Sequence, residues 1–269
     1  MLNEVLFNPV DGGQDFVEIY NNSNKYLDLQ NWLLGNHYAD TIANLKNLSD
    51  STFIIHPQEI WVLCKDVENL LLYHPYSIKK QVIELHTMPA YNNEDGCVFL
   101  LNQTTLMDAF CYHEEMHFDL LQSVDGISLE RVHPELDYWQ SAAESVGFST
   151  PTLPNSQSQT LIENSNPISI EPTLFSPNND GQDDLLQIKI SLGLGQYAGS
   201  IHIYDQNGLL IKLLQNNVLF GSEEVFFWDG TSDQGYKAPI GRYILFLEAI
   251  NHQGKIVKAK KTCVLGGRL

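Results

Sequence analysis

The run NEVLFNPVDGGQDFVEIYN, residues 3–21, alternates apolar and polar side chains on either side of a Val-Asp-Gly-Gly turn. After the turn, Val17 and Ile19 point to one side while Glu18 points to the other. This period of two is typical of a β-strand with one buried face. The run therefore predicts two strands joined by a turn.

Short runs of the same kind recur through the first half of the chain and are separated by Asn, Asp and Gly. One segment differs, because DVENLLLYH (66–74) has helical spacing and stops at Pro75. Regular short strands with polar turns predict a sandwich or a barrel. The recurring runs are LDLQNWLL (27–34), EIWVLC (59–64), GCVFLLN (96–102), LMDAFCY (106–112) and ISLERV (127–132).

A boundary follows at TPTLPNSQSQTLIENSNP (150–167), which is rich in Thr, Pro, Asn, Ser and Gln and has little to bury. A second set of strand-like runs begins after it, with hairpin turns at 206–208 and 251–254. The predicted fold is all-β, with two immunoglobulin-like β-sandwich domains in tandem. We expect the first domain over residues 1–156, a linker over 157–171 and the second domain over 172–269.

Charge is unevenly divided along the chain. The net charge is −18, of which −16 falls in residues 1–156, which contain six basic and twenty-two acidic residues. Such a domain repels phosphate backbones, so nucleic acid and anionic membrane surfaces are excluded as general partners.

No apolar run approaches the roughly 18–20 residues that a membrane-spanning helix needs, so we expect no membrane insertion. Met1 leads directly into a strand-like run, and we expect the sequence to belong to a longer chain with further domains upstream.

The four cysteines are Cys64, Cys97, Cys111 and Cys263, and no two form a CxxC pair. Each lies in an apolar, strand-like run, which favours buried free thiols. A single bridge from Cys64 to either Cys97 or Cys111 is the alternative.

Several motifs resemble known families when they are taken in order. The first half resembles the lamin-tail domains of Bacteroidetes surface proteins through NEVLFNP (3–9), DFVEIYNNS (15–23), LDLQNWLL (27–34), SLERVHP (128–134) and WQSAAESVGFSTPTLPNSQ (139–157). The second half resembles the C-terminal immunoglobulin-like module of those bacteria, which is similar in pattern to the gliding-motility-associated and flagellar hook-capping domains. Its motifs are FSPNNDGQDD (175–184), IYDQNG (203–208), WDGTSDQG (228–235) and PIGRYIL (239–245).

The resemblance implies a secreted or cell-surface scaffold, often exported by the type IX secretion route, with no catalytic residues. We therefore expect a non-enzymatic module that positions or anchors a larger surface protein. The alternative is an adhesion module that binds a cell-surface protein or a polysaccharide through loops, with Tyr73, His74, Tyr76 and Tyr91 as aromatic candidates for sugar stacking. Trp228 and Tyr243 are expected in the core, and Arg131 is expected to pair with a carboxylate such as Glu18.

One motif suggests an enzyme. His113-Glu114-Glu115-Met116-His117 matches the HExxH pattern of zinc proteases. That chemistry requires a helix, because only there do residues i and i+4 share a face and bind one zinc ion. The preceding run, residues 106–112, alternates as a strand, so a zinc hydrolase is kept only as a remote alternative.

A second motif suggests a metal site. Asn178, Asp180, Gln182 and Asp184 place carboxylate and amide oxygens around Gly181, and such oxygens can hold calcium. The twelve-residue EF-hand pattern is absent. The other interpretation is a turn in which Asn and Asp side chains bond their own backbone. No cofactor is certain from the sequence, and calcium is the candidate that this loop suggests.

Overall fold

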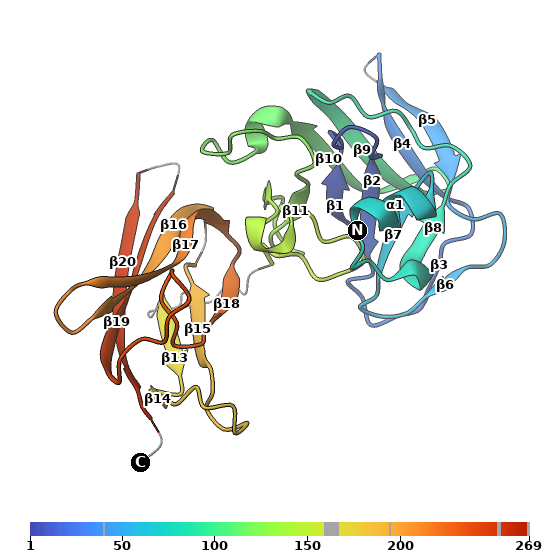
Figure 1. Cartoon of the computed structure of the whole chain (residues 1–269). Coiled ribbons are helices and arrows are strands. Elements are labelled where there is room, and N and C mark those ends of the chain that lie inside the picture. The colour runs from blue at the N-terminus through green and yellow to red at the C-terminus, as the bar shows by residue number, and fades with distance from the viewer. Residues whose placement is uncertain (40, 159–166, 194, 252–253, 268–269) are drawn as a thin grey trace. The chain divides into compact units, whose positions relative to one another are not determined.

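The computed structural model describes residues 1–39, 41–158, 167–193, 195–251 and 254–267. The described residues form strands almost throughout, which confirms the expected all-β class. The chain divides into two compact units, Met1–Ser158 and Gln159–Leu269 (Figure 1). We call them unit 1 and unit 2 and describe each by itself.

Unit 1 is built from two main sheets and a small strand pair. The six-stranded sheet has the order β12 (Trp139–Ser141), β11 (Leu129–Arg131), β1 (Leu2–Leu6), β2 (Phe16–Tyr20), β7 (Ile60–Cys64) and β8 (Val82–Glu84), and β7 and β8 run parallel. The four-stranded sheet has the order β10 (Thr105–His113), β9 (Asp95–Asn102), β4 (Trp32–Tyr38) and β5 (Thr41–Asn47). The small pair joins β3 (Leu27–Asp28) to β6 (Ile54–Ile55).

The main core of unit 1 lies between the two larger sheets. Val17 and Ile19 of β2 point into it, as their alternation with Glu18 predicts, and Val98 and Leu100 of β9 meet them from the opposite sheet. All four side chains are almost completely removed from water. Burial of aliphatic side chains contributes the largest favourable term in folding, so this layer holds the sandwich together.

The other, outer face of the six-stranded sheet carries the one α-helix that the described residues form, α1 (Val67–Tyr73). Asp66 caps its N-terminus by accepting a hydrogen bond from the amide of Asn69 at 3.0 Å. Leu70 packs onto a small cluster that includes Phe16. The helix predicted over residues 66–74 is therefore confirmed, and it ends just before Pro75 as expected.

Unit 2 is also built from two sheets. One has the order β13 (Ile168–Glu171), β15 (Leu186–Ser191) and β18 (Glu223–Trp228). The other has the order β14 (Leu174–Phe175), β20 (Ile256–Leu265), β19 (Gly241–Asn251), β16 (Tyr197–Asp205) and β17 (Leu210–Phe220). Trp228 and Tyr243 are buried in its core with ring centroids 5.0 Å apart, as the sequence predicts.

The predicted linker over residues 157–171 differs from the structure at both ends. Gln157 is completely buried in unit 1, and residues 168–171 form β13, which pairs with β15. Polar composition suggested an exposed connection, but the side chains before residue 159 find buried hydrogen-bond partners in unit 1. Residues 159–166 of the predicted linker lie outside the described residues. The hairpin predicted at 206–208 forms between β16 and β17, whereas 251–254 includes two residues that are not described.

The cysteines differ from the expectation of four free thiols. Cys97 and Cys111 form a disulfide between β9 and β10, while Cys64 and Cys263 are free and buried. Cys97 and Cys111 are directly opposed residues of neighbouring strands. That pairing depends on strand register, which the spacing of the four cysteines does not reveal.

We predict that thiol labelling will follow this pattern. Burial raises the pKa of both the Cys64 and the Cys263 thiols to about 12, so neither should react in the folded protein. Mass spectrometry should count no labels in the native protein, two in concentrated guanidinium chloride, and four after reduction. The double variant Cys97→Ser, Cys111→Ser is the control and should show two labels when denatured, with or without reductant. Four labels in the unreduced denatured protein would contradict the disulfide.

Candidate functional site

A pocket of about 600 Å³ opens on the outer face of the six-stranded sheet of unit 1. One wall is the end of α1 and the turn that follows it, residues 73–77. The other wall belongs to residues 145–158, which cross the same face of the sheet and which we call the covering segment. The lining residues of the two walls are Tyr73, His74, Pro75, Tyr76, Ser77, Ser145, Val146, Gly147, Ser149, Thr150, Pro151, Leu153 and Pro154.

Beneath the covering segment, three glutamates lie side by side on neighbouring strands. Glu4 of β1 is the direct cross-strand partner of both Glu130 on β11 and Glu18 on β2. All three are completely buried, although their place in the alternating pattern predicts an outward face. Buried carboxyl groups are tolerated only when their oxygens receive hydrogen bonds. The covering segment supplies most of these donors.

Thr150 joins two of the glutamates. Its amide donates to Glu4 Oε1 at 2.8 Å, and its hydroxyl oxygen lies 3.1 Å from Glu4 Oε2 and 2.6 Å from Glu130 Oε1. A hydroxyl has a single hydrogen, so it cannot donate to both carboxyl groups. Both contacts are hydrogen bonds only when one of the two carboxyl groups carries a proton and donates to the Thr150 oxygen. The geometry therefore suits a cluster that holds a protonated carboxyl.

The remaining oxygens are satisfied in the same way. Glu130 Oε2 accepts from the Ser156 hydroxyl at 2.9 Å and from the Gln157 amide at 2.8 Å. Glu18 accepts from the Thr152 amide at 2.7 Å. The covering segment is therefore bound to the sheet along much of its length.

The pKa values agree with a proton-holding cluster. Burial, assisted by the neighbouring Glu130 carboxylate, raises the pKa of Glu4 to about 8. Burial also raises the pKa of Glu18 well above its usual value, with a further contribution from Glu4. The pKa of Glu130 is raised as well, chiefly by burial. The cluster thus keeps protons that free carboxylic acids would lose at neutral pH.

In the pocket wall, His74 and Ser149 face each other, with Nδ1 of the imidazole 2.8 Å from the serine hydroxyl oxygen. The His74 ring also packs edge-on against Phe16. Burial lowers the pKa of His74 to about 4, so the ring is neutral at pH 7. Among the described residues, no carboxylate hydrogen-bonds to this imidazole, so the pair lacks the third member of a catalytic triad.

The structure brings together three of the four aromatic residues that the sequence suggested for sugar stacking. Tyr73, His74 and Tyr76 line the pocket. Tyr91 is 7% exposed and belongs to the core instead, where its hydroxyl donates to the Gly35 carbonyl. Its flanking Asn residues suggested a loop, but the ring packs inward between the sheets.

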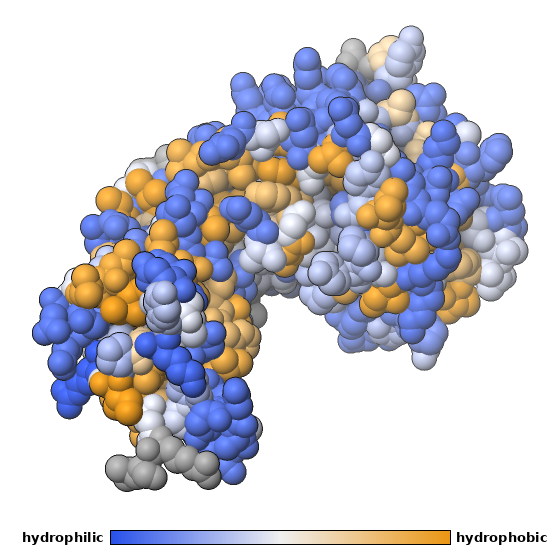
Figure 2. Space-filling model, viewed as in Figure 1, coloured by the Kyte–Doolittle hydropathy of each residue, from blue (hydrophilic) through white to orange (hydrophobic). Residues whose placement is uncertain are grey.

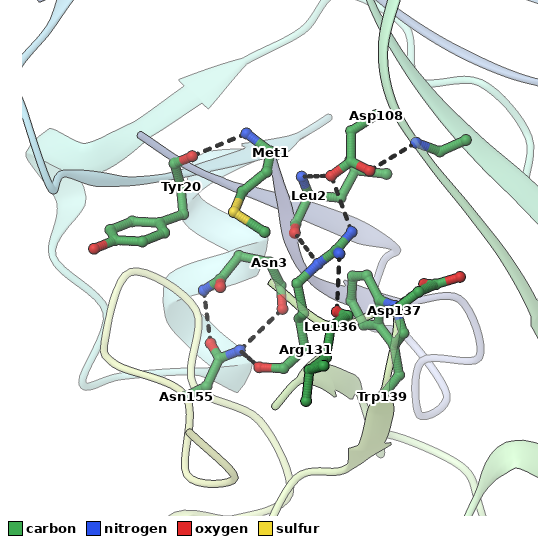
Figure 3. Close-up of polar contacts among 11 residues, drawn as sticks. Met1, Leu2, Asn3, Tyr20, Asp108, Arg131, Leu136, Asp137, Trp139 and Asn155 are labelled. Carbon is green, nitrogen blue, oxygen red and sulfur yellow. Dashed lines mark hydrogen bonds and ion pairs between the residues drawn. The ribbon is translucent and has the colours of Figure 1, made fainter. Parts of the chain in front are cut away.

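Arg131 binds a different carboxylate from the one expected. Its guanidinium lies 2.9 Å from Asp108 of β10 and donates to the Leu2 carbonyl at 2.9 Å, so it links the two sheets (Figure 3). The same group stacks over the Trp139 ring at 4.7 Å. Glu18 lies on the opposite face of the sheet from this network and bonds the covering segment instead.

The HExxH motif does not form the helix that zinc chemistry requires. His113 ends β10, residues Glu114–Met116 form a single 3₁₀ turn, and both histidines have extended backbone angles. His117 is buried, with Nδ1 2.9 Å from the Ser141 hydroxyl oxygen, while the side chain of His113 is half exposed. The two imidazoles therefore do not share a helix face, and the condition set for a zinc hydrolase is not met.

The loop that contains the suggested calcium ligands is organised by Asp184. Its Oδ1 accepts from the amides of Asn178 at 3.0 Å and Asn179 at 2.7 Å, and its Oδ2 accepts from the Gly181 amide at 2.8 Å. These backbone bonds, led by that from Gly181, lower the pKa of Asp184.

Asp180 is occupied in a similar way. Its oxygens accept from the Gln182 amide at 2.9 Å and from the Asn178 side-chain amide at 2.8 Å. The alternative of an Asx-rich turn thus describes these contacts directly. Calcium binding by the four residues stays a prediction. Calorimetric titration with calcium chloride tests it.

Residues 169–264, most of unit 2, match the family model of the CHU_C type IX secretion signal domain. No curated protein matches the sequence significantly. Similar solved structures include FlgD from P. aeruginosa, at 16% identity over 40% of this chain and 76% of that chain, with a TM-score of 0.27. Two others come from Porphyromonas gingivalis. Dimeric latent PorU has 12% identity over 100% of this chain and 20% of its own, with a TM-score of 0.28.

The other structure from Porphyromonas gingivalis is PorZ, an essential surface component of the type IX secretion system. It has 11% identity over 99% of this chain and 39% of its own, with a TM-score of 0.28. The chain thus spans well under half of PorU and of PorZ.

The matched signal domain indicates that the chain belongs to a secreted, cell-surface protein, which confirms the expected location. No helix among the described residues is long and apolar enough to cross a membrane. The lamin-tail assignment concerns residues outside the match and stays a prediction.

We predict that the free energy of unfolding of unit 1 falls as pH rises from 6.5 towards 8. In this range folded Glu4 holds a proton that the unfolded chain, with a pKa near 4.5, has lost. The folded state then binds more protons, so stability declines with pH, by up to about 1.4 kcal/mol per pH unit for each proton. Burial lowers the pKa of His74 and His117 to about 4. These two residues make stability rise with pH, but chiefly below pH 6.5, where the unfolded chain protonates them. Urea titration with pulse proteolysis, read by unit 1 peptides, measures the effect.

The variant Glu4→Gln tests the origin of this pH dependence. Glutamine has the shape of a protonated glutamate and can donate to the Thr150 hydroxyl while accepting from the Thr150 amide. We expect a weaker pH dependence in this variant. Glu68→Gln on the exposed surface of α1 is the matched control and should behave as the wild type. An unchanged slope in Glu4→Gln would contradict the role of the cluster.

Proposed function

We propose that this chain exports and attaches a larger surface protein, with unit 2 as the secretion signal and unit 1 as a non-catalytic, lamin-tail-like interaction module. The match of residues 169–264 to the type IX secretion signal domain is the observation that carries the proposal. In this view the domains upstream of unit 1 contribute the activity of the whole protein. Unit 1 positions or anchors those domains at the cell surface.

The internal use of polar groups in unit 1 supports a structural and binding role. Glu4, Glu18 and Glu130 bond the covering segment, and Arg131 bonds Asp108, so these buried polar groups hold the fold together. Catalytic groups, by contrast, keep an open side toward a substrate. A partner would therefore bind to the surface of unit 1 and not to these buried groups.

Adhesion to a polysaccharide or a surface protein is the second candidate function. It is favoured by the pocket, because a concave site of this size lined by aromatic and apolar side chains is typical of ligand binding. The two roles are compatible, since a module that holds a protein at a surface must bind something there.

We predict that the chain directs export of a reporter protein. A reporter fused in front of residues 1–269 should reach the cell surface of a Bacteroidetes host with a working type IX system. It should stay inside an otherwise identical host that lacks the system. Surface proteolysis and immunoblotting of the medium measure both results.

Two truncations complete the export test. Deletion of residues 167–269 should abolish export, because it removes the matched domain. Deletion of residues 1–158 should leave export intact and release more reporter into the medium, because it removes the attachment module. Export that survives deletion of residues 167–269 would refute the assignment of unit 2.

A further inference from the structure

We propose that the pocket between α1 and the covering segment binds one or two rings of an uncharged saccharide, a ligand class that rests on the interaction role proposed above for unit 1. Four features of the pocket favour such a ligand: its size, the charge of its walls, the exposed tyrosines at its edge and the rigidity of the segments that form it.

The size of the pocket suits a small rigid ligand. A volume of about 600 Å³ lies in the middle of the range of roughly 300–1,000 Å³ that small-molecule sites occupy. One or two sugar rings fit such a space. The remainder of a polysaccharide chain would leave through the open side into solvent.

The walls favour a neutral ligand. None of the thirteen lining residues is Asp, Glu, Lys or Arg, and the single histidine, His74, is neutral because burial lowers its pKa to about 4. An ionised ligand would therefore lose water without gaining an opposite charge. The surrounding domain, at −16, would in addition repel an anion. A neutral molecule does not lose the hydration of an ion on binding and is not repelled by the charge of the domain.

The edge of the pocket offers exposed rings. Tyr76 is 85% exposed and Tyr73 is 37% exposed. Figure 2 shows apolar surface, in orange, among polar atoms where Figure 1 draws α1, and the exposed Leu72 belongs to this helix. A tyrosine ring presents an apolar face together with a hydroxyl group. A pyranose has the matching pattern, an apolar C–H face with hydroxyl groups around its rim.

The polar groups of the walls suit hydroxyl groups. A neutral imidazole has one hydrogen-bond donor and one acceptor, and Nδ1 of His74 is bonded to Ser149, so a ligand contact from this residue would use its other ring nitrogen. A sugar hydroxyl can either donate or accept and matches this nitrogen in both tautomers. A proline-rich peptide, which aromatic grooves also bind, lacks backbone N–H groups and needs a row of successive grooves. The saccharide is therefore the better match.

Both walls are already fixed before a ligand arrives. The Ile78 amide, one residue beyond the first wall, donates to the Thr152 hydroxyl at 2.6 Å and so ties this part of the chain to the covering segment. The Tyr73 hydroxyl donates to the Asp11 carbonyl at 3.0 Å and holds its ring in place. Thr150 is fixed by the glutamate cluster. Little freedom is lost when such a site binds, so more of the contact energy appears as affinity.

We predict that the intact chain binds a neutral oligosaccharide and that Tyr76→Ala weakens binding about tenfold, because it removes a stacking face. The probes are cellohexaose, maltohexaose, laminarihexaose, mannohexaose and xylohexaose, compared with hexagalacturonate, chitosan hexamer and a decaproline peptide. Isothermal titration calorimetry measures the affinities. Tyr76→Phe keeps the ring and should stay within about threefold of the wild type.

Tyr38→Ala is the matched control, since Tyr38 is 70% exposed at the end of β4 and does not line the pocket. It should leave the affinity unchanged. Failure to bind every neutral probe would refute the proposal, as would binding that Tyr76→Ala leaves intact. Preference for a charged oligosaccharide or for decaproline would refute it too. None of these results would affect the export of the reporter. Calorimetry therefore tests the saccharide pocket, and the export assay tests the proposed function.

Discussion

Three glutamates on adjacent strands, Glu4, Glu18 and Glu130, receive the hydrogen bonds that hold the covering segment against the outer face of the six-stranded sheet. Buried carboxyl groups are costly without such partners, and the segment, rich in Ser and Thr, supplies most of them. The sheet and the segment therefore depend on one another. Without the segment the acidic groups would lose most of their hydrogen-bond donors, and without the sheet the polar segment would have no surface on which to pack.

The same contact produces the candidate site. Thr150 is held from below by two carboxyl groups, while its neighbours Ser149 and Pro151 form part of the pocket wall. The opposite wall comes from α1, whose Leu70 packs onto the apolar part of the same sheet face. One face of one sheet thus carries an apolar patch under a helix and an acidic patch under the covering segment. The pocket lies between these two covers.

The chemistry that a local motif can perform depends on the backbone conformation of the residues that form it. The HExxH spacing is meaningful only on a helix, and here His113 and His117 flank a single 3₁₀ turn. The acidic loop before β15 contains oxygens that suit calcium, yet Asp184 directs both of its oxygens to backbone amides. Spacing alone does not reveal which partners a side chain will find, since backbone conformation decides where its oxygens and nitrogens point.

The sequence by itself determined the all-β class, helix 66–74, the core positions of Trp228 and Tyr243, and the opposite faces of Val17 and Glu18, because alternation is a local property of the chain. It also indicated Tyr73, His74 and Tyr76 as surface candidates. Only the tertiary structure decided that the outward glutamates would be buried, that Cys97 would pair with Cys111, and that a polar segment would close a pocket. These outcomes depend on which distant strands and segments become neighbours, and that information is not contained in any short stretch of sequence.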